Sequence, residues 1–364
     1  MAESLAAVIT AFGQPLEIRK VPIPDLEPGA MLVQVDAATL CGTDAHFWHG
    51  MPFLASKIPY IPGHETCGTI VEMNGPRNSL VGEPLKVGDR IIAAYPYCGS
   101  CYYCTVARQA VLCESGWRYG RERCDQPPYL LGGCAQHHYI PPGCDVVQVP
   151  DEVPSPLAAS AACALRTIMH AFERLGHVSG HESVVVQGAG PVGLYALAVA
   201  RDRGARKVIV VGAPAPRLEV AREWGADVTL NLDDEPDPAR RKEWILEQTS
   251  GRGPDIVLQC ASGDTAVPEG IDFIRPGGRF VSVGSAGGVI PAAALFKFIT
   301  IYGVFMAEGR HFYEAVNFLA SRRKQFPFER LISGSYPLEK TYEALVAMAE
   351  YREVKPVILP NKAA

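Results

Sequence analysis

One segment of the sequence, a strand-like run that leads straight into a glycine motif, restricts the possible folds most strongly. The strand is expected over Ser183–Gln187 and an apolar helix over Leu194–Ala200. Between them stands a G-x-G-x-x-G motif, made of Gly188, Ala189, Gly190, Pro191, Val192 and Gly193. The first glycine permits a tight turn, the second lets the backbone approach a pyrophosphate, and the third lets the helix pack closely on the strand. The helix N-terminus adds N–H donors and a dipole that favours phosphate, so the segment predicts a dinucleotide-binding βα unit.

Strands and helices continue to alternate after this motif. Lys207–Val211, Ile256–Gln259 and Arg279–Val283 have the pattern of buried strands, and Arg217–Gly225 has that of a helix. Such alternation is typical of a parallel, doubly wound sheet with helices on both faces. The sequence therefore predicts an α/β fold for this part of the chain.

The first 150 residues are different, because Pro and Gly interrupt short β-branched runs that predict a β-rich domain. A chain of 364 residues with 48% hydrophobic residues is too long for one typical domain. After residue 299 the pattern turns to helices and ends in a strand over Pro356–Leu359, which we expect to return to the first domain. We predict a β-rich catalytic domain over 1–164 and 301–364, and an inserted Rossmann domain over 165–300.

The position that selects the adenosine ribose carries an unusual residue. The strand Lys207–Val211 is followed by Gly212, where a carboxylate usually holds the ribose 2′-hydroxyl. Arg217 lies close enough in sequence to reach a ribose hydroxyl or a 2′-phosphate. We therefore expect NAD(P)(H) as the cofactor, with NADP slightly favoured over NAD.

Four cysteines, Cys98, Cys101, Cys104 and Cys113, fall within sixteen residues. This spacing suits a tetrahedral all-cysteine zinc site in a loop, and such a closed site has no position for a substrate. We expect it to be structural, stabilising a lobe that lacks its own core. Core cysteines do not normally recur every third residue, which disfavours the alternative of scattered buried thiols.

A second, discontinuous group contains further metal-binding side chains. Its members are Cys41, Thr43, Asp44, His46, His64, Glu65 and Cys163. Two thiolates and one imidazole are the ingredients of an open zinc site, with water or substrate as the fourth ligand. Spacing alone does not show that these residues come together in the fold. Taken singly, each also has an ordinary structural explanation, as a core cysteine or as a hydrogen-bonded loop histidine.

At this point the sequence resembles the zinc-containing medium-chain alcohol dehydrogenases, including threonine and polyol dehydrogenases, from end to end. The resemblance rests on C-G-T-D-A-H at 41–46, G-H-E at 63–65, the four-cysteine lobe, Cys163 and the glycine motif. It implies a GroES-like catalytic domain and two zinc ions per chain. By the same resemblance Cys41, His64 and Cys163 would bind the catalytic zinc.

The resemblance also implies roles for the surrounding residues. Asp44 would hold His64, and Glu65 would lie behind the metal. Thr43 and His46 would relay a proton from the alcohol to solvent as hydride leaves for the nicotinamide.

Two further residues acquire cofactor roles in the same way. Thr167 is placed near the nicotinamide and Lys355 near the pyrophosphate, although the family often has Arg at the second position.

The sequence departs from the family pattern at three places. Eight residues separate Cys104 from Cys113 where seven are usual, which predicts a local bulge. Cys163 stands where polyol and threonine dehydrogenases commonly have Glu, which favours the alcohol dehydrogenase branch. Gly212 replaces the usual Asp.

Charge and composition exclude several classes of partner. Lys plus Arg total 34 against 39 Asp plus Glu, giving a net charge of -5 without long runs of like charge, which argues against nucleic acid or anionic membrane as a partner. No uninterrupted apolar run suits a membrane span, and the first residues lack a basic signal-like start. We expect a cytoplasmic protein with free thiols.

We therefore predict a zinc-dependent alcohol dehydrogenase or carbonyl reductase that uses NAD(P). Aromatic residues near the metal motifs favour a bulky or secondary alcohol if they line the pocket; they are Phe47, Trp48, Tyr95 and Trp117. The alternatives are a polyol or amino-alcohol dehydrogenase and, from another class, a non-catalytic dinucleotide-binding protein. The resemblance suggests a homodimer or homotetramer.

Overall fold

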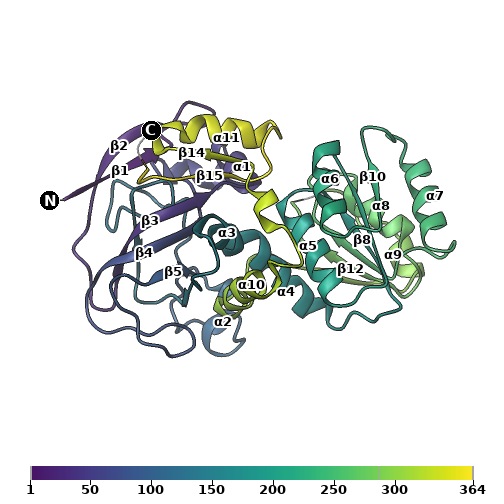
Figure 1. Ribbon diagram of the computed structural model, residues 1–364, viewed down its shortest axis with the longest axis horizontal. Coiled ribbons are helices and arrows are strands. Elements are labelled where there is room, and N and C mark those ends of the chain that lie inside the picture. The colour runs from purple at the N-terminus through teal and green to yellow at the C-terminus, as the bar shows by residue number, and fades with distance from the viewer. Residues whose placement is uncertain (1, 286, 363–364) are drawn as a thin grey trace. The chain divides into compact units, whose positions relative to one another are not determined.

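The computed structural model describes residues 2–285 and 287–362, and the chain divides into two compact units (Figure 1). Unit 1 comprises Met1–Cys163, Ala307–Ser321 and Leu331–Ala364, and unit 2 comprises Ala164–Met306 and Arg322–Arg330. Within the described ranges, no helix has both the length and the apolar character needed to cross a membrane.

Unit 2 is built on a six-stranded sheet in which every neighbouring pair is parallel. The spatial order is β10-β9-β8-β11-β12-β13, so the chain reverses direction across the sheet between β8 and β11. This is the doubly wound dinucleotide-binding order, and it confirms the predicted α/β fold. The strands are β8 (Ser183–Gln187), β9 (Lys207–Gly212), β10 (Val228–Asn231), β11 (Ile256–Gln259), β12 (Arg279–Ser282) and β13 (Thr300–Gly303).

Helices cover both faces of this sheet (Figure 1). One set is α4 (Arg166–Leu175), α5 (Pro191–Asp202) and α6 (Ala215–Glu223), and the other is α7 (Pro238–Gln248), α8 (Ala266–Phe273) and α9 (Ala293–Phe296). The central strands are consequently buried on both sides, which explains the continuous apolar run of β8. Val185, Ile209, Val257 and Phe280 are all fully buried in one cluster.

The boundaries of unit 2 differ from those expected from the sequence at two places. Residues 301–306 belong to unit 2 because β13 pairs with β12 and forms the edge of its sheet. Residues 322–330 also belong to it, since Phe328 packs edge-on against Trp224 with ring centroids 5.3 Å apart.

Unit 1 contains a seven-stranded sheet and a separate two-stranded ribbon of β1 (Glu3–Val8) and β2 (Glu17–Pro22). The larger sheet has the order β14-β15-β3-β4-β5-β7, and β6 pairs with β3 as well. Its strands are β3 (Met31–Thr39), β4 (Glu65–Met73), β5 (Arg90–Ala93), β6 (His137–Ile140), β7 (Val146–Gln148), β14 (Gly334–Tyr336) and β15 (Pro356–Ile358). This mixed, mainly antiparallel sheet is the predicted β-rich domain.

Helices and short turns complete unit 1 and place its chemical groups. The α-helices are α1 (Gly42–His49), α2 (Tyr102–Thr105), α3 (Ser155–Ser160), α10 (Gly309–Arg322) and α11 (Thr341–Ala349). The short turns are η1 (Pro52–Lys57), η2 (Ala110–Leu112) and η5 (Leu338–Lys340), with a π-helical turn, η3 (Ala161–Leu165), directly after α3. The turn η4 (Phe328–Leu331) lies where the 322–330 segment of unit 2 ends.

Candidate functional site

Three segments that lie far apart in the sequence bring a metal-binding cluster together in unit 1, in which His64 is buried and the two cysteines are partly buried. Cys41 is the N-cap residue of α1, His64 directly precedes β4, and Cys163 lies in the π-helical turn η3. Their ligand atoms and a carboxylate oxygen of Glu65 all lie within 4.8 Å of one another. Cys41 Sγ is 3.4 Å from His64 Nε2. The structure thus assembles the set that sequence spacing left open, and π-helical turns frequently occur at such functional positions.

Asp44 fixes the orientation of the His64 ring. Its Oδ1 lies 3.2 Å from His64 Nδ1 and accepts a hydrogen bond from the Gly63 backbone N–H, while its Oδ2 accepts one from the Cys41 N–H. With Nδ1–H donated to this carboxylate, the Nε2 lone pair faces Cys41, which is the arrangement that a metal-binding histidine needs. Burial disfavours the charged imidazole, but the Asp44 charge outweighs burial and raises the pKa of His64.

Glu65 and Lys355 form a fully buried ion pair beside this cluster. Lys355 Nζ lies 2.6 Å from Glu65 Oε1, and Thr39 Oγ1 donates to the other carboxylate oxygen. Burial raises the pKa of Glu65 to about 7, although the Lys355 charge opposes this shift. The sequence motifs gave no signal for Thr39, the last residue of β3. The family resemblance placed Lys355 near the pyrophosphate, and that role stays a prediction.

The two thiols of the cluster differ in acidity because one donates a hydrogen bond to the other. This bond raises the pKa of Cys41 to about 12 and lowers that of Cys163 well below its ordinary range. Two sulfurs, one oriented imidazole and a closely spaced geometry fit a zinc ion that leaves a coordination position for substrate.

The second cluster lies in a lobe formed by one continuous segment. The Sγ atoms of Cys98, Cys101, Cys104 and Cys113 lie within 4.8 Å of one another. Cys101 Sγ is 3.5 Å from Cys104 Sγ, and the Cys98 N–H donates to Cys113 Sγ at 3.3 Å. Backbone N–H groups of Ser100 and Cys101 lower the pKa of Cys98 to about 6. Four thiols with this local spacing fit a tetrahedral zinc site.

The segment between Cys104 and Cys113, for which a local bulge was predicted, contains one residue with an unusual backbone conformation. Arg108, between Cys104 and Cys113, has φ 52°, and the turn η2 then leads back to Cys113. Positive φ is uncommon for a residue other than glycine.

The glycine motif of unit 2 forms a tight turn that leaves no room for side chains at its glycine positions. Gly188 has φ 106°, and a Cβ atom on Gly193 would lie 1.8 Å from the Gly188 carbonyl oxygen. Pro191 and Val192 form the first turn of α5, whose N-terminal N–H groups follow the motif. These glycines fit the close approach of a dinucleotide phosphate.

The ribose-selecting end of β9 has a further steric constraint. A Cβ atom on Gly212 would lie 2.7 Å from the backbone nitrogen of Ala189. Arg217 is buried in α6, and its Nη1 lies 3.9 Å from the place that a Cβ of Gly190 would occupy. The structure therefore brings this guanidinium to the phosphate-binding turn.

The remaining predicted site residues lie on helices. Thr43 and His46 are exposed and stand three residues apart on α1, which places their side chains on one face. Thr167 is buried near the start of α4 in unit 2. Their assigned roles in proton transfer and nicotinamide binding stay predictions.

Comparison with known families agrees with this geometry. Residues 27–151 match the alcohol dehydrogenase GroES-like domain, and residues 191–321 match the zinc-binding dehydrogenase family. The 5-exo-hydroxycamphor dehydrogenase of Pseudomonas putida is 32% identical over 94% of this chain and 95% of its own length. The chain belongs to the zinc-binding medium-chain dehydrogenases.

Other members of the family show how widely its substrates vary. The L-threonine 3-dehydrogenase of Thermococcus kodakarensis is 30% identical over the whole of both chains. An alcohol dehydrogenase of Thermotoga maritima, known as a crystal structure, superposes with a TM-score of 0.92 at 32% identity and covers 99% of this chain and 100% of its own. The dehydrogenase is accordingly a zinc-dependent, NAD(P)-dependent enzyme that acts on CH–OH groups, with two candidate zinc sites.

Proposed function

We propose that this dehydrogenase interconverts a secondary or bulky alcohol and its carbonyl compound. The observation that carries the proposal is the cluster of Cys41, His64 and Cys163, whose ligand atoms converge within 4.8 Å and whose imidazole Asp44 orients. The second cluster, made only of cysteines, is assigned a structural role because four protein ligands leave a tetrahedral ion no position for substrate.

The chain's own residues are assigned the handling of the proton. When bound, zinc supplies Lewis acidity that makes the alcohol proton easier to remove, and the nicotinamide supplies the hydride acceptor. Thr43 and His46 share the exposed face of α1, where they accept that proton and pass it to solvent. Asp44 keeps His64 in its ligand tautomer throughout, because its Oδ1 remains the partner of Nδ1.

Aromatic side chains around the cluster support the choice of a bulky substrate. Phe47 of α1 packs edge-on against Phe53 with centroids 5.9 Å apart, and Tyr95 packs against Tyr119 at 5.5 Å. Tyr95 also interacts electrostatically with His64, so it lies near the metal ligands. Such rings offer apolar area rather than the polar groups that a polyol needs. The relative from Pseudomonas putida, named for 5-exo-hydroxycamphor, points the same way.

Arg217 supports NADP as the slightly preferred cofactor. The end of β9 offers Gly212 in place of a carboxylate, so no negative charge there repels a 2′-phosphate. Replacing Gly212 with Asp is a poor test, because its Cβ would clash with Ala189 whatever cofactor is present. Arg217→Ala avoids this difficulty. We expect it to weaken NADPH binding by about 10- to 100-fold, as for a lost charge-assisted hydrogen bond, and to leave NADH binding nearly unchanged.

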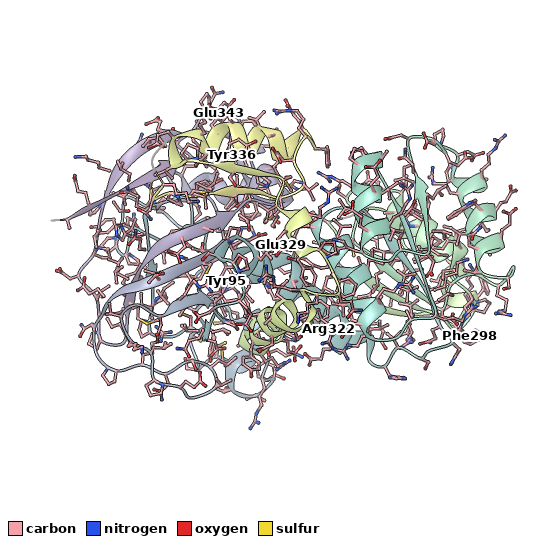
Figure 2. The ribbon with its side chains drawn as sticks, in the orientation of Figure 1. Tyr95, Phe298, Arg322, Glu329, Tyr336 and Glu343 are labelled. Carbon is pink, nitrogen blue, oxygen red and sulfur yellow. The ribbon has the colours of Figure 1, made fainter. Side chains whose placement is uncertain are left out.

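A homodimer or homotetramer completes the proposal, and the edge of the unit 2 sheet supports it. Exposed apolar residues flank the edge strand β13; they are Val289, Ile290, Leu295, Phe296, Phe298 and Phe305. Phe298 is 85% exposed and stands at the rim of its unit (Figure 2). An unprotected edge strand with apolar neighbours favours pairing with a second copy. The eleven free cysteines support a cytoplasmic, reducing location.

The proposed function is tested by turnover of the zinc-loaded protein. The substrates are cyclic secondary alcohols and their ketones, compared with ethanol, sorbitol and L-threonine, each with both cofactors. We expect the cyclic compounds to give the highest kcat/KM. A preference for threonine or sorbitol would replace the proposal with the amino-alcohol or polyol alternative. No turnover of any substrate, together with tight NADPH binding measured by tryptophan fluorescence, would favour the non-catalytic alternative.

A further inference from the structure

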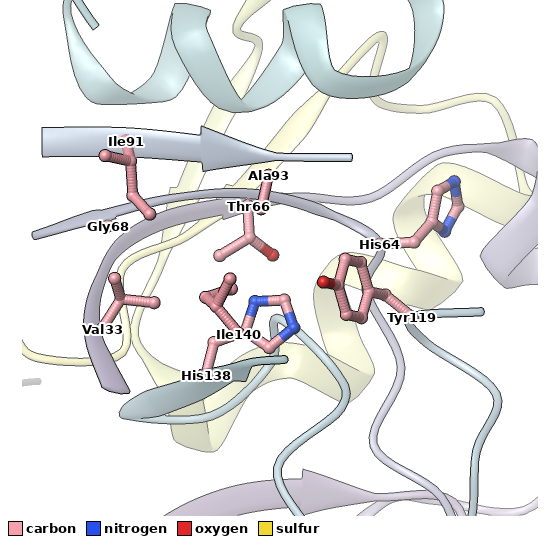
Figure 3. Close-up of a pocket in the computed structure, with 9 residues that line it drawn as sticks. All are labelled: Val33, His64, Thr66, Gly68, Ile91, Ala93, Tyr119, His138 and Ile140. Carbon is pink, nitrogen blue, oxygen red and sulfur yellow. The ribbon is translucent and has the colours of Figure 1, made fainter. Parts of the chain in front are cut away.

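A small cavity lies in unit 1 between strands that are not all paired with one another. Its volume is about 10 Å³, and it is enclosed by residues of β3, β4, β5 and β6 together with Tyr119 (Figure 3). Val33, Ile91 and Ile140 form apolar parts of the wall. The Thr66 hydroxyl, the His138 ring and the Tyr119 hydroxyl face the same space, whereas the His64 ring is turned away from it.

Three buried polar atoms at this cavity have no hydrogen-bond partner among the described residues. They are Thr66 Oγ1 and both ring nitrogens of His138, and the two residues are only 8% and 2% exposed. Leaving such groups unsatisfied destabilises a fold, and native proteins rarely tolerate it. Two orphaned groups that face one cavity therefore need a common explanation.

The surrounding side chains do not supply the missing partners. Tyr119 packs its ring edge-on against His138, with centroids 4.5 Å apart, and its hydroxyl donates to Cys144 Sγ at 3.7 Å. The Tyr119 oxygen keeps a free lone pair as an acceptor. The other lining residues are aliphatic or glycine, apart from His64, whose ring is turned away from the cavity.

We propose that this cavity is a binding site for one internal water molecule that bridges the Thr66 hydroxyl and a ring nitrogen of His138. The volume matches the space that a single water needs, and a buried water requires two to four polar partners. Thr66, His138 and Tyr119 provide that number.

The same groups exclude a metal cation at this position. Burial lowers the pKa of His138 to about 3, so the ring is neutral and offers one donor and one acceptor nitrogen. The cavity lining contains no carboxylate or thiol to balance a cation. A neutral ligand that both donates and accepts is therefore the chemical class that fits.

The water would connect two strands that the sheet itself does not join. β4 and β6 each pair with β3 and not with each other. Thr66 is also two residues beyond His64, so the bridge fixes the beginning of the strand that follows this metal ligand. The site depends on the fold alone and holds whether or not the proposed substrate is correct.

The direct test is a crystal structure of the zinc-loaded protein at about 1.5 Å resolution. We expect a single density peak at hydrogen-bond distance, about 2.7–3.2 Å, from Thr66 Oγ1 and from one His138 nitrogen. An empty cavity, or a direct hydrogen bond between Thr66 and His138, would overturn the proposal.

A mutant cycle provides a second test that needs no crystals. Thr66→Val and His138→Phe each remove polar atoms with little change of shape, and we expect each to lower Tm by about 2–6 °C. The double variant should lower Tm by clearly less than the two single losses added together. In the double variant neither polar residue remains, so no buried polar group is left without a partner. Thr66→Ser, which keeps the hydroxyl, is the matched control. Strictly additive losses, or equal losses for the Ser and Val variants, would contradict a shared water.

Discussion

The two sulfur clusters of unit 1 are held in opposite ways. Cys41, His64 and Cys163 come from distant segments and are surrounded by buried charged groups, of which Asp44 is 1% exposed and Lys355 is fully buried. The four cysteines of the lobe come from one stretch of sixteen residues, and Cys98 is exposed to solvent. Their hydrogen bonds are to one another, to the Ser100 hydroxyl and to nearby backbone N–H groups.

This difference indicates which cluster is held in place by the packing of the fold and which is held in place by its metal ion. The first cluster is assembled by strands and helices that have their own packing contacts, so we expect its ligands to stay close together when zinc is removed. The lobe has little apolar packing: Tyr102, Val106 and Leu112 are all exposed. Metal-binding free energy is then a large part of what orders the lobe, as in other small structural zinc sites.

Matched serine substitutions give the largest expected effects and test the comparison directly. We expect Cys41→Ser to reduce kcat/KM by on the order of 10³-fold, since several kcal/mol of Lewis-acid stabilisation are lost. Its Tm in the zinc-depleted state should stay near that of the parent. Cys104→Ser should instead make residues 98–113 sensitive to limited proteolysis. Kinetics, zinc content and protease mapping report these outcomes.

Cys124→Ser is the control for both variants, because Cys124 is buried but belongs to neither cluster. It should keep both zinc ions and full turnover. Full turnover of Cys41→Ser would refute the catalytic assignment, and a protease-resistant lobe in Cys104→Ser would refute the dependence of the lobe on its metal.

Lys355→Met tests the buried charges that distinguish the first cluster. The substitution leaves the Glu65 carboxylate buried beside Thr39 without its cation, and breaking a buried pair in this way costs about 3–5 kcal/mol. We expect urea unfolding to show a loss of this size, and Glu65→Gln combined with Lys355→Met to recover part of it. A loss below about 1 kcal/mol would mean that the pair does not stabilise the unit.

The sequence predicted the local features and missed those that depend on long-range packing. The strand, glycine motif and helix from Ser183 to Ala200 are all present, because each depends on neighbours in the chain. The four-cysteine lobe was equally readable from its spacing. In contrast, β10 and β13 went unpredicted, since these four-residue strands are partly exposed and lack a continuous apolar run.

The first cluster shows the same limit, because its assembly depends on long-range packing that the sequence pattern does not reveal. Cys41, His64 and Cys163 were named by resemblance, but spacing gave no reason for them to meet. Thr39 was not predicted at all, because a threonine at the end of a strand carries no motif. Lys355 pairs with a residue 290 positions away, which only the assembled sheet reveals.

Acid unfolding distinguishes the interior beside the first cluster from the lobe. Burial lowers the pKa of His138 from 6.5 to about 3, so between these pH values the unfolded chain binds a proton that the folded chain does not. The free energy of unfolding is therefore not reduced by His138 above pH 6.5, and it decreases as the pH falls from 6.5 towards 3. This gives a slope of about 1.4 kcal/mol per pH unit. The lobe, residues 98–113, contains no histidine to add a similar term.

His138→Phe should flatten this slope by about one proton when urea unfolding is measured from pH 4 to 6.5. His49→Phe is a suitable control, because His49 is exposed on α1. Parallel stability curves for the parent and His138→Phe would show that His138 is not the group responsible.

The smallest expected effect concerns Arg118, which joins the two regions. Its Nη2 donates to the carbonyls of Val111 and Cys113 in the lobe at 3.3 Å, and its Cζ lies 5.6 Å from the ring centroid of Tyr95, near the first cluster. Arg118→Met keeps the apolar stem but loses the carbonyl contacts and a cation–π interaction of about 0.5–1 kcal/mol. We expect KM to rise about 2- to 5-fold with kcat nearly unchanged, because the proposed role of Tyr95 is to line the substrate pocket and not to transfer the proton.

Arg121→Met is the matched control for Arg118→Met. Arg121 also lies over an aromatic ring, with its Cζ 5.5 Å from the centroid of Phe53, and it carries the same charge. If only Arg118→Met also speeds zinc release from the lobe to a chelator, then the lobe and the substrate wall are coupled through this side chain. Equal effects of both variants on KM, with zinc release unchanged, would reduce the role of Arg118 to general positive charge and leave the two clusters independent.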